Sequence, residues 1–117
     1  MKSAIKAQAD GSIDLVLLDA TEIWQYSFSE CYALTSVSAP KATKIEAFAF
    51  RNCTALTSLT FGTVTYVDNE LFGLLDLSTS TTCDLTLGAE TTAGDLDVEN
   101  KTWAGMTWKS ITLVDSN

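Results

Sequence analysis

The three cysteines, Cys31, Cys53 and Cys83, are the first residues whose chemistry could define a site. A zinc site is poorly supported, because the chain contains no histidine and no Cys-x-x-Cys pair. A cysteine nucleophile would lack the histidine base that activates it. We therefore expect three thiols that behave as small apolar side chains, with no metal and no cofactor bound to them.

Carboxylates form a second candidate group in the segment Asp95-x-Asp97-x-Glu99-Asn100, which begins like a calcium-binding EF-hand loop. The sixth position lacks the required glycine, and the twelfth is Met106 instead of glutamate. A solvated acidic loop is the interpretation that we favour. Paired carboxylates for glycoside cleavage are not excluded, but no pattern points to them. We expect no catalytic residue and no enzyme activity.

Exposed aromatic and hydroxyl side chains are the third candidate group. An aromatic side chain on the surface is a rigid anchor for a protein partner or a sugar ring. The chain has three tryptophans and three tyrosines. Which of them face solvent depends on the elements that carry them, and those elements follow from an internal repeat.

The repeat is clearest where residues 20–40 (ATEIWQYSFSECYALTSVSAP) are placed over residues 42–62 (ATKIEAFAFRNCTALTSLTFG), a shift of 22 residues without gaps. The tetrapeptide Ala-Leu-Thr-Ser returns unchanged in the second copy. Matched pairs are Ile23/Ile45, Phe28/Phe50, Cys31/Cys53, Leu34/Leu56 and Val37/Leu59. Such a period predicts a solenoid, in which each coil buries its apolar face against its neighbours.

The same frame continues toward the C-terminus with less similarity. Val67, Phe72 and Leu75 take the isoleucine, phenylalanine and cysteine positions, and an insertion in 76–82 delays the strand 85–87. The expected divisions of the single domain 1–117 are a partial N-terminal coil at 1–19, coils at 20–41, 42–63 and 64–88, and a degenerate coil or cap at 89–117.

Apolar side chains at equivalent positions should meet as ladders, because stacked strands lie about 4.8 Å apart. At that spacing, parallel cysteine side chains on neighbouring coils are too far apart for a disulfide. We expect Trp103 and Trp108 to cap the core. The ladders are Ile23/Ile45/Val67/Val98, Phe28/Phe50/Phe72/Trp103, Cys31/Cys53/Leu75/Met106, Leu34/Leu56/Trp108 and Leu15/Val37/Leu59/Leu85/Ile111.

Positions that alternate with the ladders should face solvent. Trp24 stands where the next coil has Glu46, and Tyr66 stands where earlier coils have charged residues. The alternative is that each aromatic covers a neighbouring loop. The long strands would present a flat hydroxyl face of the kind that solenoids use for partners, or a plain solvated surface. The candidate partner-binding residues are Trp24, Tyr32, Tyr66, Ser36, Ser38, Ser58, Thr60 and Thr86.

The net charge of −8, with seven scattered lysines and arginines, argues against nucleic acid and anionic membranes as partners. It favours a basic partner through weak electrostatic steering. No run of about 18 apolar residues predicts insertion into a bilayer, and residues 1–4 do not begin a secretory signal. The strand edge at 15–18 carries no blocking charge or proline, so we expect a longer protein or a homodimer through this edge.

The pattern Thr-x-Ile-(x)4-Phe-x-x-Cys-x-x-Leu-Thr-Ser-Val-x-x-Pro resembles the BspA-like leucine-rich repeats, most closely over residues 20–62. The resemblance implies a right-handed, β-rich leucine-rich-repeat solenoid of about four coils with parallel strands and little helix. It also implies a secreted or cell-surface location in bacteria or protists, and a role in adhesion to proteins. A structural spacer and a carbohydrate-binding face built on Trp24 and Tyr66 are the alternatives.

Overall fold

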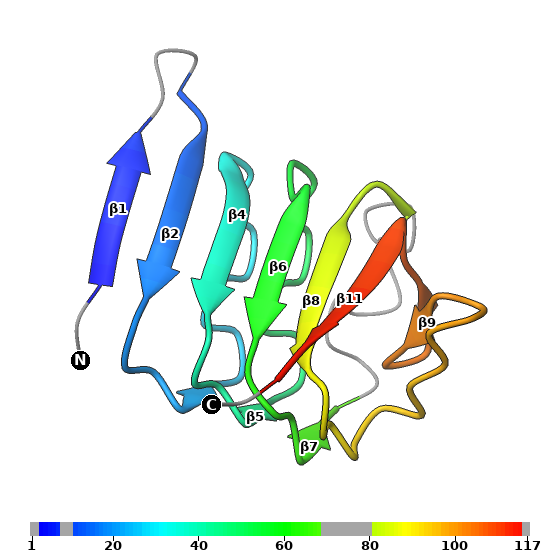
Figure 1. Cartoon of the computed structure of the whole chain (residues 1–117). Helices are drawn as coiled ribbons and strands as arrows, with labels where there is room; N and C mark the ends of the chain where they lie inside the picture. Colours follow the sequence, from blue (N-terminus) through cyan, green and yellow to red (C-terminus); the bar gives the residue numbers. More distant parts are fainter. Residues whose placement is uncertain (1–2, 8–10, 69–80, 116–117) are drawn as a thin grey trace.

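A computed structural model describes the backbone of residues 3–7 and all atoms of residues 11–68 and 81–115. The chain forms a β-solenoid of about four turns (Figure 1). Its long sheet has the order β1-β2-β4-β6-β8-β11 and its second sheet the order β3-β5-β7. The long strands are β1 (Ser3–Ala7), β2 (Ile13–Leu17), β4 (Leu34–Ala39), β6 (Ser58–Phe61), β8 (Asp84–Gly88) and β11 (Ser110–Val114). The short strands are β3 (Glu22–Ile23), β5 (Lys44–Ile45) and β7 (Tyr66–Val67).

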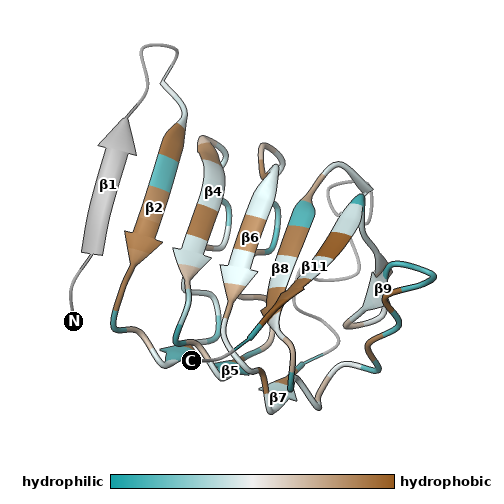
Figure 2. Cartoon of the chain, in the orientation of Figure 1, coloured by the Kyte–Doolittle hydropathy of each residue, from teal (hydrophilic) through white to brown (hydrophobic). Residues whose placement is uncertain are grey.

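The register of the long sheet confirms the predicted ladder. The parallel pairs are Leu15↔Val37, Val37↔Leu59, Leu59↔Leu85 and Leu85↔Ile111. Hydrophobic and polar residues alternate along these strands, as Figure 2 shows for β4, β6 and β8. The alternation places one face of each strand in the core and the other toward solvent.

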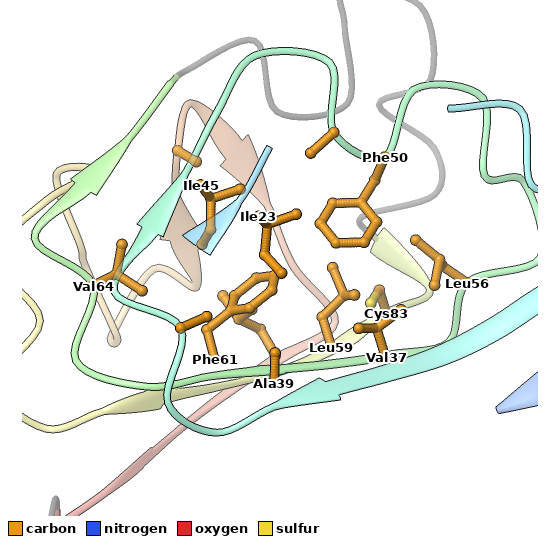
Figure 3. Close-up of a cluster of buried hydrophobic side chains, with 14 of the residues drawn as sticks. Ile23, Val37, Ala39, Ile45, Phe50, Leu56, Leu59, Phe61, Val64 and Cys83 are labelled. Carbon is orange, nitrogen blue, oxygen red and sulfur yellow. The ribbon is translucent and has the colours of Figure 1, made fainter. Parts of the chain in front are cut away.

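The second sheet stacks in the same way. Ile23 pairs with Ile45 and Ile45 with Val67, and the rings of Phe28 and Phe50 stack with centroids 5.3 Å apart. The core fills the space between the two sheets (Figure 3). A described coil therefore buries its apolar side chains mainly against its neighbours, as the 22-residue period requires.

The N-terminal edge differs from the expectation of an open strand. β1 pairs with β2 in antiparallel register, from Ser3↔Leu17 to Ala7↔Ile13. The prediction that the 15–18 edge is free for a homodimer is therefore wrong, because a hairpin from the same chain occupies it. This pairing is not part of the repeat, so the period gave no signal for it.

The last coil also departs from the prediction. Val98 is 43% exposed instead of extending the isoleucine ladder, which ends at Val67 in the β3-β5-β7 sheet. The side chain of Asp97 accepts hydrogen bonds from the backbone N–H (3.1 Å) and Nδ2 (2.8 Å) of Asn100, and Asp97 bridges to Thr102. This local turn removes Val98 from the core, since such side-chain-to-backbone bonds compete with regular ladders.

A short hairpin and two tryptophans close the C-terminal end of the core. The hairpin consists of β9 (Thr102–Trp103) and β10 (Met106–Thr107). Trp103, Met106 and Trp108 are buried, as predicted. The indole N–H of Trp103 donates to the carbonyl of Ala93, and that of Trp108 donates to the carbonyl of Trp103, each at 3.0 Å. Both polar tips are thus satisfied inside the cap.

Two further expectations concern the third coil and membrane insertion. The predicted positions of Phe72 and Leu75, and most of the insertion at 76–82, lie outside the described residues. Within the described part of the chain, no helix is long and apolar enough to span a membrane.

Candidate interaction surfaces

The aromatic side chains that the repeat predicts to be outward are exposed. Trp24 directly follows β3 and is 65% exposed, Tyr32 precedes β4 and is 58% exposed, and Tyr66 in β7 is 47% exposed. Trp24 ends the strand at a turn, where the N–H and Oγ of Ser27 both donate to its carbonyl at 3.0 and 2.6 Å. Their exposure is settled by the structure, whereas their role in binding is a proposal.

A further exposed aromatic, Tyr26, was missed by the sequence reasoning. Its ring stacks on that of Phe48, with centroids 5.5 Å apart and planes inclined by 11°. Both residues have positive φ, 61° and 58°, which bulky residues adopt infrequently. The sequence did indicate that these two residues are neighbours, because Tyr26 and Phe48 are separated by the 22-residue repeat period. We call residues 24–33 the first-coil arc; it contains Trp24, Tyr26 and Tyr32.

Tyr66 lies two coils further along the solenoid. The ammonium of Lys44 lies over its ring, 5.6 Å from the centroid, which is a cation–π contact. The two residues are also paired across β5 and β7. One face of the Tyr66 ring is therefore already covered by Lys44 and is less accessible to a ligand.

The first-coil arc also leaves the end of the core partly open. Phe28 and Cys31 are half-buried, whereas their equivalents Phe50 and Cys53 in the next coil are buried. The thiol of Cys53 lies 2.8 Å from the carbonyl oxygen of Phe28, to which it donates. The difference between equivalent residues arises because no described residue supplies a coil on the outer side of the arc.

The outer face of the long sheet carries two polar rows. The five residues predicted for this face, Ser36, Ser38, Ser58, Thr60 and Thr86, are half-buried. Two carboxylates that the prediction omitted lie in the same row: Ser36 Oγ donates to Asp14 Oδ1 at 2.7 Å, and Ser110 Oγ donates to Asp84 Oδ1 at 2.6 Å. Some of these hydroxyls are thus engaged within the protein, which leaves fewer of them for a partner.

The cysteines and the acidic loop are the remaining candidate groups. All three cysteines are free. Burial, with a smaller contribution from the charge of Asp84, raises the pKa of the Cys83 thiol to about 12. Hydrogen bonds from Asn100 lower the pKa of Asp97, which matches a solvated turn. Among the residues described, no three histidine, cysteine or acidic side chains gather as metal ligands.

Comparison with protein families gives one match. A family model described as "BspA type Leucine rich repeat region (6 copies)" matches residues 17–87, which is more than half of the chain. Comparisons with curated proteins and with solved structures give no match. The matched region extends from the end of β2 into β8 and includes the whole first-coil arc.

Proposed function

Because this chain belongs to the BspA-type leucine-rich-repeat family, we propose that it is a non-catalytic protein-binding module of a bacterial cell-surface protein, acting in adhesion. Leucine-rich-repeat solenoids are in general binding scaffolds without catalytic activity, and members of this family are typically associated with the cell surface. The observation that carries the proposal is the group of exposed aromatic side chains on the first-coil arc.

Packing of the repeat does not require aromatic residues at these positions. The next coil has Glu46 in place of Trp24 and Thr54 in place of Tyr32, and it still stacks in register. Large aromatic side chains lose little conformational entropy on binding and dominate the energy of many protein interfaces. A partner that covers Trp24 and Tyr32 would remove apolar area from water, which supports binding as the role of this surface.

The test is binding of the purified chain to immobilised extracellular-matrix proteins, measured by surface plasmon resonance. We expect the double substitution Trp24→Ala and Tyr32→Ala to weaken binding by about tenfold or more, the usual effect of removing interface anchors. Val98→Ala is the matched control, because Val98 is also exposed but lies on the C-terminal turn. If both variants bind as the unmodified chain does, the module is a structural spacer.

A carbohydrate-binding face is a second candidate, favoured by the exposure of Trp24. An exposed indole can stack on a sugar ring. Tyr66, the other residue expected in this face, already contacts Lys44, which weakens the pair as a platform. Quenching or a shift of tryptophan fluorescence by soluble oligosaccharides, lost in Trp24→Ala, would favour this function over protein binding.

A further inference from the structure

The hydrogen bonds between coils indicate which backbone groups of the first coil face its outer side. In the second coil, the N–H of Thr43 donates to the carbonyl of Thr21 (2.8 Å) in the first coil, and the N–H of Glu46 donates to the carbonyl of Ile23 (2.9 Å). The third coil repeats this with Thr65 to Thr43 (2.8 Å) and Asp68 to Ile45 (3.0 Å). The residues that flank each of these short strands thus point two N–H groups toward the coil that precedes it.

Carbonyl groups of the second coil also accept hydrogen bonds from the first-coil arc. The N–H of Phe28 donates to the carbonyl of Ala49 at 2.8 Å, and the N–H of Glu30 donates to that of Arg51 at 2.7 Å. The carbonyls of the second coil therefore point back toward the first. By repeat equivalence, the first coil points outward two N–H groups and two carbonyls, those of Thr21, Trp24, Ser27 and Ser29. Among the described residues, no other coil pairs with these four groups.

Apolar side chains are partly exposed on the same outer side of the first coil. The ring of Phe28 covers Phe50, but Phe28 itself is half-exposed together with Cys31. On the same side of the molecule β1 covers β2 in the long sheet, and at the other end Trp103 and Trp108 cover the C-terminal core, where β11 is the last described strand of the long sheet. The β3 edge therefore combines partly exposed apolar side chains with backbone groups that pair with no described coil, the combination that strand addition requires; one of these groups, the carbonyl of Ser29, accepts only a long contact from Cys31 Sγ at 4.0 Å.

The charge of this edge restricts the occupant. The first coil, residues 20–41, contains two exposed glutamates, Glu22 and Glu30, and one cation, Lys41, which pairs with Asp19 at 3.4 Å. The two cations of the following coil are Lys44, which lies over Tyr66, and the half-buried Arg51, whose carbonyl accepts from the N–H of Glu30. A second copy of the chain on this edge would bring like charges together, which is unfavourable. A basic segment would instead be attracted.

We propose that the outer edge of β3 and the first-coil arc bind an extended, basic segment of a partner protein by strand addition. The inference rests on the protein-binding function proposed above. The segment pairs its backbone with the N–H groups of Thr21 and Trp24 along β3, places apolar side chains on Phe28 and Cys31 beyond the turn, and directs lysine or arginine side chains toward Glu22 and Glu30. Recognition thus uses both backbone hydrogen bonds and charge.

The probe is a short, end-capped peptide of alternating isoleucine and lysine, titrated into the ¹⁵N-labelled full chain and followed by NMR. We expect saturable shifts and slowed hydrogen exchange at the amides of Thr21 and Trp24. The double substitution Glu22→Gln and Glu30→Gln should weaken binding about fivefold, since rim charges contribute modestly. Glu90→Gln, on an exposed turn after β8, is the matched control and should leave the affinity unchanged.

Two further peptides make the outcomes decisive. A peptide of alternating isoleucine and glutamate, and an isoleucine–lysine peptide with N-methylated backbone amides, should each bind at least about tenfold more weakly. Equal binding by either, shifts confined to the hydroxyl face, or no binding at all overturns the inference. Loss of matrix-protein binding in the Trp24 and Tyr32 variant would still stand in that case, so the failure of the strand-addition site and the failure of the proposed function are distinguishable.

Discussion

Gly94 and Trp103 show how tightly single residues determine the C-terminal cap. Gly94 has φ of +85°, and a Cβ atom built on it would lie 2.4 Å from Nε1 of the buried indole. The same indole donates to the neighbouring carbonyl of Ala93. A side chain at position 94 would therefore have to displace a ring that is both buried and hydrogen-bonded.

The first residue-scale prediction concerns this contact. Gly94→Ala should lower the free energy of unfolding by about 2–4 kcal/mol, because it adds a steric clash to an unfavourable left-handed backbone. Gly11→Ala is the control: Gly11 has a similar φ of +88°, but its Cβ would meet open space. The control should cost about 1 kcal/mol, measured by urea denaturation. Equal losses would show that the indole moves aside without cost.

The second residue-scale prediction concerns Cys83. Its pKa rises from 9.0 to about 12 in the folded chain, so the native thiol holds its proton after the unfolded thiol has lost it. Stability from this group is complete below pH 9 and falls as the pH rises toward 12. Urea denaturation above pH 9 should show a steeper loss for the unmodified chain than for Cys83→Ala. Parallel pH profiles would contradict this expectation.

At the scale of the element, each coil takes its stability from its neighbours. The equivalent residues Phe28 and Phe50 have the same chemistry and the same repeat position, but they differ in burial: Phe28 covers one side of Phe50, whereas no described coil covers the outer side of Phe28. Phe50 also approaches Phe61, with centroids 5.9 Å apart. Position along the solenoid, more than residue type, sets what each phenylalanine contributes.

The comparison of these two residues gives an element-scale prediction. Phe50→Ala should lower the free energy of unfolding by about 3–5 kcal/mol, the usual cost of removing a buried phenylalanine. Phe28→Ala should cost roughly half as much, because part of its ring already contacts water. Urea denaturation of the two variants provides the measurement. A cost for Phe28→Ala equal to that for Phe50→Ala would mean that the outer side of the first coil is not open.

At the scale of the whole molecule, one end of the core is closed by tryptophans and the other presents aromatic and acidic residues. The net charge of −8 produces a negative potential around the chain, and the first coil adds to it locally. A basic partner should therefore be guided toward the chain during encounter. This steering affects the association rate more than the dissociation rate.

Salt dependence tests the whole-molecule expectation. The association rate constant of the isoleucine–lysine peptide, followed by stopped-flow tryptophan fluorescence, should fall about tenfold between about 0.05 M and about 0.5 M NaCl, while dissociation changes less. The expectation fails if association is insensitive to salt, which would assign binding to apolar contact alone. The Glu22→Gln and Glu30→Gln variant should show a weaker dependence on salt.

The sequence also allowed much of the candidate surface to be predicted. Trp24, Tyr32 and Tyr66 were predicted to be outward because their equivalents in other coils are polar, and they are exposed. The ring stack of Tyr26 on Phe48 was not predicted: the repeat period makes the two residues equivalent, but the positive φ values that orient both rings were not apparent from the sequence. The hydrogen bonds of Asp14 and Asp84 on the sheet face depend on cross-strand distances that residue types do not reveal.

By itself, the sequence determined the solenoid and its register, because a period of identical length in neighbouring segments leaves one way to align their apolar residues. Ile23 therefore meets Ile45, and Val37 meets Leu59. The tertiary structure was needed to show how the two ends of the solenoid are covered. The antiparallel pairing of β1 and the local turn at Asp97 lie outside the repeat, and both depend on contacts that no periodic pattern encodes.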